Sequence, residues 1–151
     1  MALELAGGGE GPCLLVFWGA GYGRGMTTLQ PAQIGHLVAG LLSVNQYPLS
    51  RARALMPGIA AQGLLDPATV LGAHADLTTE RLRAAGYERG GFAPILARRL
   101  YPLMRAIEAG ELDSLPEAVA TDARDEFVRV LSGVFGFGPI TAGAAWASWK
   151  A

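Results

Sequence analysis

Two glycines separated by one apolar residue, Gly136 and Gly138, constrain the fold of this sequence more than any other feature. Glycine adopts backbone dihedral angles that are closed to residues with a Cβ atom, and it allows a second backbone to approach closely. Apolar residues flank both glycines, and an alanine-rich segment follows directly. The run predicts a tight connection between two packed helices, the second beginning at Pro139.

The remainder of the sequence carries helical signals and no sustained alternation of apolar and polar residues. Apolar residues recur at spacings of three and four across residues 34–42, which is typical of a helix with one buried face. Pro31 suits the first turn of that helix. Asp66 before Pro67 predicts an N-cap, with a short helix that ends near Gly72. We expect an all-α domain, a compact barrel or bundle of six to eight helices.

Prolines, glycines and polar residues give the boundaries of the middle helices. A helix that begins near Pro48 is predicted to end or kink at Pro57, because proline inside a helix removes a hydrogen bond. Thr78 or Thr79 is predicted to cap the next helix. A glycine in the left-handed conformation commonly ends a helix, so this one is expected to close at Gly86.

The last third of the sequence continues the helical pattern. A long helix with Pro102 inside it is predicted to end at Ala109. Residues 111–120 are predicted to form a polar connection. Thr121 or Asp122 is then predicted to cap the helix that leads to the two glycines.

Composition limits the class of protein. Residues 1–27 are rich in glycine and are expected to form a lead-in to one helical domain of residues 28–151. The longest apolar stretch near the start is far too short to span a bilayer, so we expect a soluble, cytoplasmic protein without membrane contact. The single cysteine, Cys13, excludes an internal disulfide and a cysteine-based zinc or iron–sulfur site. No metal site is expected.

The glycine run is also the main chemical signal. Main-chain amides of a tight turn, together with the start of the following helix, form a small anion site. The sequence holds no other phosphate-binding loop, so a DNA backbone is the expected ligand. The net charge of −1 argues against nonspecific coating of nucleic acid, but it is compatible with a local basic face.

Three segments in this order resemble the helix-hairpin-helix (HhH-GPD) DNA glycosylase superfamily, whose members include endonuclease III, the adenine glycosylases and oxoguanine glycosylase. The segments are residues 41–46, residues 86–92 and the glycine run at residues 134–142. The resemblance extends from about Gln30 to Trp149, the six-helix barrel portion of those enzymes. It implies base-excision repair and double-stranded DNA, damaged or abasic, as the partner.

The resemblance implies roles for particular residues. Hairpin amides of the family grip the phosphate backbone, often with a bound monovalent cation, and the matching positions are Gly136, Phe137, Gly138 and Thr141. No other cofactor is implied. A packed connection between helices, without any ligand, is an equally open interpretation of these four positions.

Two further turns match DNA-contacting positions of the family. Family members insert a polar side chain into the gap left by a flipped nucleotide, and Asn45 or Gln46 suits that role because a hydrogen-bonding filler offsets part of the cost of extrusion. The turn that follows Gly86 brings a basic residue to the DNA, and Arg89 is the match here. A polar helix terminus and a solvated arginine are the corresponding structural interpretations.

The sequence departs from the family at its catalytic positions. Bifunctional members carry a nucleophilic lysine two residues after the second hairpin glycine, where this sequence has Ile140, so no AP-lyase activity is expected. The family's catalytic aspartate follows the second hairpin helix, and the sequence reaches Ala151 before that position. The catalytic residues are therefore unknown. A shortened monofunctional glycosylase and a protein that engages DNA without catalysis are both compatible with this pattern.

A non-enzymatic helical interaction domain is the alternative function. Trp146 and Trp149, together with the apolar residues 14–18, are expected to need cover from a second copy of the chain or a protein partner. A small-molecule enzyme has no nucleophile–base pair, carboxylate dyad or metal-ligand spacing to support it.

Overall fold

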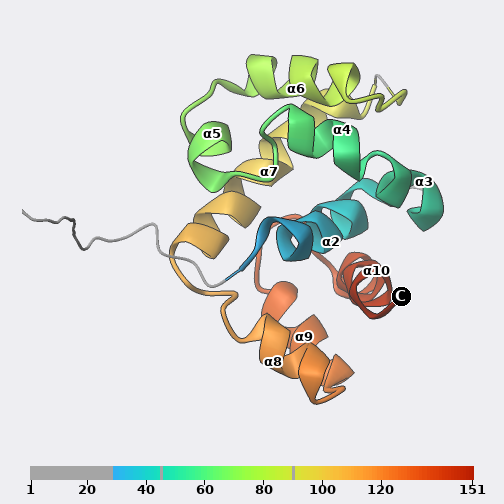
Figure 1. Ribbon diagram of the computed structural model, residues 1–151, viewed down its shortest axis with the longest axis vertical. Coiled ribbons are helices and arrows are strands. Elements are labelled where there is room, and N and C mark those ends of the chain that lie inside the picture. The colour runs from blue at the N-terminus through green and yellow to red at the C-terminus, as the bar shows by residue number, and fades with distance from the viewer. Residues whose placement is uncertain (1–28, 45, 90) are drawn as a thin grey trace, which may run out of the picture.

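The computed structural model describes residues 29–44, 46–89 and 91–151, which form helices and loops without any strand (Figure 1). The helices of these residues are α2 (Pro31–Leu42), α3 (Leu49–Ala54), α4 (Met56–Ala61), α5 (Pro67–Leu71), α6 (Ala75–Ala84), α7 (Ala93–Glu108), α8 (Leu115–Ala120), α9 (Arg124–Leu131) and α10 (Pro139–Lys150). The predicted all-α class is confirmed, although the nine helices of the described residues exceed the expected six to eight. None of them is long and apolar enough to cross a membrane. The predictions for residues 1–27 and for Asn45 lie outside the described residues.

Helix α2 lies at the centre of the molecule and has other helices on several sides (Figure 1). It begins at Pro31, as the sequence predicts, and the side chains of its predicted apolar face are buried. Those residues are Ile34, Leu37, Val38, Leu41 and Leu42. Full burial of one such side chain contributes about 1.5–3 kcal/mol, so this face is a major source of the stability of the fold.

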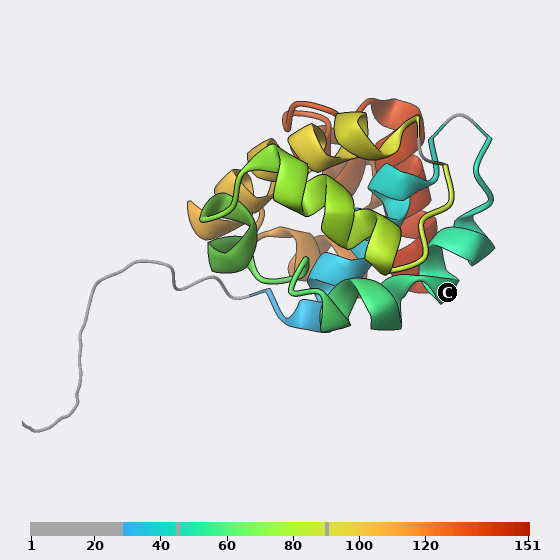
Figure 2. The same cartoon turned by 90° about the horizontal axis from the view of Figure 1, so that it is seen from above.

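Helix α10 packs antiparallel against α2, and two contacts fix the direction. Gly40 faces Ala145 so closely that a Cβ atom added to the glycine would lie 2.7 Å from the alanine Cβ. One turn earlier in α2, the Nδ1 atom of His36 lies 2.8 Å from the hydroxyl of Ser148. The start of α10 therefore lies beside the end of α2, as Figure 2 also shows.

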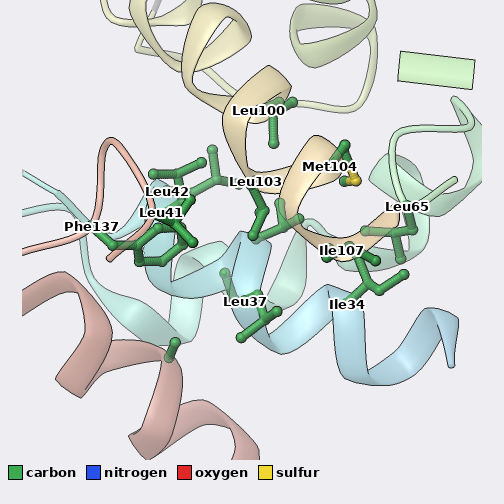
Figure 3. Close-up of a cluster of buried hydrophobic side chains, with 14 of the residues drawn as sticks. Ile34, Leu37, Leu41, Leu42, Leu65, Leu100, Leu103, Met104, Ile107 and Phe137 are labelled. Atoms are coloured by element: carbon green, nitrogen blue, oxygen red, sulfur yellow. The ribbon is translucent and has the colours of Figure 1, made fainter. Parts of the chain in front are cut away.

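Helix α7 covers the opposite side of α2. Leu100, Leu103 and Ile107 of α7 point toward Leu37 and Leu41 of α2 in the core (Figure 3). Helix α7 ends next to Ala109, as predicted, and it contains Pro102. The predicted Asp66 cap is also confirmed, because its carboxylate accepts a hydrogen bond from the Ala68 amide at 3.3 Å.

The predicted start of α6 is wrong. The helix begins at Ala75, and the N-cap is His74, whose Nδ1 atom accepts a hydrogen bond from the amide of Asp76 at 3.1 Å. Thr78 and Thr79 lie one turn inside the helix with both side chains buried. The helix starts earlier because a histidine ring nitrogen performs the capping that a threonine hydroxyl was expected to perform.

The break between α3 and α4 precedes the proline that was predicted to cause it. Helix α3 ends at Ala54, and Pro57 lies in the first turn of α4. A proline is tolerated there because the first amides of a helix have no partner within the helix. Gly58 lets α4 approach the end of α6, since an added Cβ atom would lie 2.7 Å from the carbonyl oxygen of Ala85.

The segment predicted as a polar connection contains α8. Leu115 and Ala118 are buried on its inner face, which is enough apolar contact to form a short helix. Thr121 and Asp122 do not cap α9, which begins at Arg124. Thr121 instead follows the last residue of α8, and its hydroxyl donates to the carbonyl of Glu117 in the first turn of that helix.

The two tryptophans of α10 are less exposed than the sequence suggested. The ring of Trp146 meets Phe127 of α9 edge-on at a centroid distance of 5.3 Å, and Trp149 lies 5.7 Å from the same ring. Trp149 also stacks on His36. Both rings are partly buried, because α9 and α2 cover part of their surface.

Candidate nucleic-acid interface

Residues 132–138 join α9 to α10 and are called the glycine loop below. Gly136 has a φ of +100°, a left-handed conformation that requires glycine, as predicted. Gly138 has a φ of −99° with extended backbone, so the same prediction is wrong for this residue. A Cβ atom added at Gly138 would meet nothing within 4 Å. The second glycine therefore leaves open space in front of the start of α10.

Several amides of the glycine loop and of the first turn of α10 have no acceptor among the described residues. They are the N–H groups of Phe135, Gly136, Gly138, Ile140 and Thr141. The amide of Phe137 is different, because it donates to the carbonyl of Val134 at 3.1 Å. Of the four residues predicted to contact phosphate, Gly136, Gly138 and Thr141 thus have an amide donor without an acceptor among the described residues. The fourth, Phe137, closes the loop with its amide.

Phe137 is a packing residue. Its ring is buried and lies against Leu41 and Leu42 at the end of α2 (Figure 3). The glycine loop is held to the end of α2 by this side chain. The two neighbouring apolar side chains face outward instead, since Phe135 is 76% exposed and Ile140 is 89% exposed. The Ile140 side chain is a hydrocarbon and has no lone pair with which to attack a sugar.

Turns that are distant in sequence meet beside the end of α2. A guanidinium nitrogen of Arg89 donates to the carbonyl of Val44 at 3.2 Å, so the segment before α7 is tied to the turn after α2. The same guanidinium lies 4.5 Å from the centre of the Phe92 ring and 5.8 Å from that of Tyr47. Arg89 also lines one pocket with Gln46, the predicted nucleotide-gap residue that the structure describes.

Gln46 is exposed and has a φ of +67°. This left-handed conformation costs a residue with a Cβ atom about 1 kcal/mol or more. The adjoining turn is closed by a hydrogen bond of 3.1 Å from the amide of Tyr47 to the carbonyl of Val44. A strained, exposed glutamine at a predicted DNA-contacting position is consistent with a functional constraint.

A shallow pocket of about 300 Å³ lies between these two turns. It is lined by Gln46, Tyr47, Pro48, Arg51, Glu88 and Arg89. The carboxylate of Glu88 accepts one hydrogen bond from the Tyr47 hydroxyl at 3.2 Å and another from Arg51 at 2.5 Å. Burial, followed by the nearby Glu88 charge, raises the pKa of Tyr47, so this hydroxyl stays protonated and donates.

The pocket and the glycine loop both adjoin the end of α2, the pocket through the turn that carries Val44 and the loop through Phe137. The starts of α7 and α10 lie close to each other near the upper edge of Figure 2. The antiparallel packing explains this arrangement. Pro139 is six residues before Ala145, so it extends about 9 Å beyond the Gly40 contact, toward the turn that follows Leu42.

Charge is unevenly distributed along the chain. Residues 81–105 contain six arginines and one glutamate, whereas residues 108–126 contain seven acidic residues and one arginine. The side chain of Arg99 reaches the glycine loop, where its aliphatic part lies 3.3–3.4 Å from the place of a Cβ atom on Gly136. The overall charge of −1 therefore conceals a basic stretch of sequence, two of whose arginines, Arg89 and Arg99, lie at the pocket and at the glycine loop respectively.

Three residues at the pocket and the glycine loop were not predicted from the sequence: Tyr47, Arg51 and Arg99. Arg51 is largely exposed, and its pairing with Glu88 spans 37 positions. No group of three or more potential metal ligands gathers in the described part of the chain.

Comparison with protein-family models, with curated proteins and with solved structures finds no match.

Proposed function

We propose that this chain binds double-stranded DNA as a helix-hairpin-helix module similar to that of the DNA glycosylases, with preference for damaged, abasic or distorted duplex. One observation carries the proposal: donors without acceptors among the described residues, at Gly136, Gly138 and Ile140, belong to a loop that packs on the end of α2, next to the turn held by Arg89. Amides at a helix start attract anions, since the helix dipole adds partial positive charge there. Phosphate oxygens are the anions that DNA presents.

The proposal concerns DNA engagement. Schiff-base chemistry at the lysine position is excluded by Ile140, whose side chain lacks a nucleophile. The carboxylate that lines the pocket, Glu88, is already engaged by Tyr47 and Arg51. A glycosylase assay on deaminated, oxidised and alkylated bases tests for hydrolysis, and robust excision would show that the protein is an enzyme with a catalytic acid that we have not identified.

Fluorescence anisotropy with labelled duplexes tests the binding itself. We expect the affinity to fall steeply with salt, with a slope of log K against log salt of roughly −3 for three or four phosphate contacts. We also expect an abasic or mismatched duplex to bind more tightly than an intact one. Binding that ignores salt, or equal affinity for all duplexes, would contradict the proposal.

A protein-interaction module is the second candidate, and the exposed side chains of Phe135 and Ile140 favour it. One of these apolar side chains is on the glycine loop and the other is in the first turn of α10, so a partner or a second copy of the chain is suited to cover both. Analytical ultracentrifugation distinguishes the two candidates. A stable dimer together with no DNA retardation at low salt would favour the interaction module.

A further inference from the structure

The ion pair between Arg51 and Glu88 lies inside the pocket of the proposed DNA-binding face. We propose that Arg51 is a ligand for a backbone phosphate, and that the Glu88 carboxylate holds this arginine in the free protein as an internal competitor of the phosphate. The inference rests on the proposed function, because it assigns a further contact within the same interface. Arg51 lies outside the three segments that resemble the glycosylase superfamily, and Glu88 is assigned a role that opposes DNA binding.

The position of Arg51 suits a phosphate ligand. It lies on α3, directly after the turn that carries Gln46, and its guanidinium is 5.4 Å from the centre of the Tyr47 ring. That aromatic contact limits the positions of the long side chain. A guanidinium binds carboxylate and phosphate through the same planar set of donors, so a site formed around a carboxylate also fits a phosphate.

The position of Glu88 makes it a competitor. Its carboxylate accepts from both Arg51 and Tyr47, and the side chains of the ion pair are 55% and 56% exposed. A phosphate reaches Arg51 from solvent without unfolding any element. It must then either displace the carboxylate or share the arginine with it, and two negative charges at one site repel each other.

The variant Glu88→Gln tests this. Glutamine keeps an oxygen that accepts the Tyr47 hydroxyl bond, so the fold is retained, while the negative charge is removed. We expect the affinity for an intact labelled duplex to rise roughly threefold to tenfold, the usual range for one exposed charge. The slope of log K against log salt should become steeper by about 0.9, since one more phosphate is neutralised.

Two further variants separate this mechanism from a general charge effect. Glu117→Gln makes the same change of charge at an exposed position of α8, which lies at the opposite end of the molecule from α6 (Figure 1). We expect its affinity to stay within about twofold of wild type, because solvent and salt screen distant surface charges. In a protein that already carries Arg51→Gln, adding Glu88→Gln should not raise the DNA affinity, because the arginine for which Glu88 and the phosphate compete is absent.

The outcomes are distinct. Equal affinity and equal salt slope for wild type and Glu88→Gln would overturn the inference and leave DNA binding intact. An equal gain in Glu117→Gln, or a gain that persists without Arg51, would overturn it as well. If neither wild type nor Glu88→Gln binds any duplex at low salt, the proposed function fails together with the inference.

Discussion

The imidazole Nδ1 of His36 and the hydroxyl of Ser148 lie 2.8 Å apart in the contact between α2 and α10. Ser148 is fully buried, and the imidazole is also stacked on Trp149. The hydroxyl is inaccessible to a substrate, so this pair is structural despite its resemblance to a nucleophile and its base. It joins the two helices whose packing positions the candidate interface.

We therefore expect stability to depend on the protonation of His36. Burial, and secondarily the Arg53 charge, lowers the pKa of His36 below its usual 6.5. The unfolded chain then binds the proton more readily than the folded one, so stability is complete above pH 6.5 and declines as the pH falls from 6.5 toward the lowered pKa. Thermal unfolding between about pH 7.5 and about pH 5.5 should show a falling Tm.

The variant His36→Gln should remove most of this pH dependence, because glutamine does not titrate. His74→Gln is the matched control, since His74 is exposed at the start of α6. An unchanged slope in His36→Gln would show that another group is responsible.

Two glycines of α2 should respond oppositely to alanine. At Gly40 the added Cβ atom would lie 2.7 Å from the backbone nitrogen of Ala145, so Gly40→Ala must separate α10 from α2 and should cost about 1–3 kcal/mol. At Gly35 the nearest atom is a side-chain carbon of Leu65 at 3.6 Å, an ordinary contact. Gly35→Ala should therefore stabilise by about 0.5–1 kcal/mol through helix propensity.

Chemical denaturation measures both changes. If the two variants were equally stable, the close approach of α2 and α10 at Gly40 would be wrong. Because the first turn of α10 contributes amides to the proposed DNA-binding site, Gly40→Ala should weaken DNA binding as well.

Alanine variants of Gly136 and Gly138 should differ in their effects on stability and on DNA affinity. Gly138→Ala places a methyl group in open space, so stability should change by less than about 0.5 kcal/mol, as for a typical surface substitution. Binding should nevertheless weaken roughly tenfold, about 1.4 kcal/mol, because the methyl group blocks approach of a phosphate to the amides. Gly136→Ala should instead destabilise the fold by about 1 kcal/mol or more, since its φ is +100°.

Anisotropy and thermal unfolding of the same two proteins give this comparison. Unchanged binding by a folded Gly138→Ala protein would show that the loop amides do not contact DNA.

Much of the fold could be predicted from the sequence where a local pattern determines the structure. The apolar spacing of α2, the cap at Asp66 and the left-handed Gly136 each depend on residues within a few positions. The missed elements depend on weaker or unusual local signals. A histidine caps α6 instead of a threonine, and α8 forms on only two buried side chains, Leu115 and Ala118.

The candidate site was predicted in part for a related reason. The resemblance placed Gln46 and Arg89 at DNA-contacting turns, but it did not indicate that Arg89 would donate to the carbonyl of Val44. The pairing of Arg51 with Glu88 depends on how α3 lies beside the segment before α7. Contacts across such sequence separations follow from the packing of helices, which no local pattern specifies.

The two polar residues of the turn after α2 should differ in their effect on abasic DNA. Gln46 has a left-handed backbone, so Gln46→Gly removes the side chain while the backbone conformation is retained without strain. If Gln46 fills the gap at a missing base, its loss should weaken binding to an abasic duplex several-fold more than binding to an intact one. Asn45→Ala should show that selective loss if Asn45 has the role.

Anisotropy on the two duplexes, at one salt concentration, gives the ratio for each variant. If each variant loses as much affinity for the intact duplex as for the abasic duplex, neither residue of this turn fills the gap at a missing base. A selective loss in only one of them identifies the inserted residue, because a general phosphate contact weakens binding to both duplexes alike.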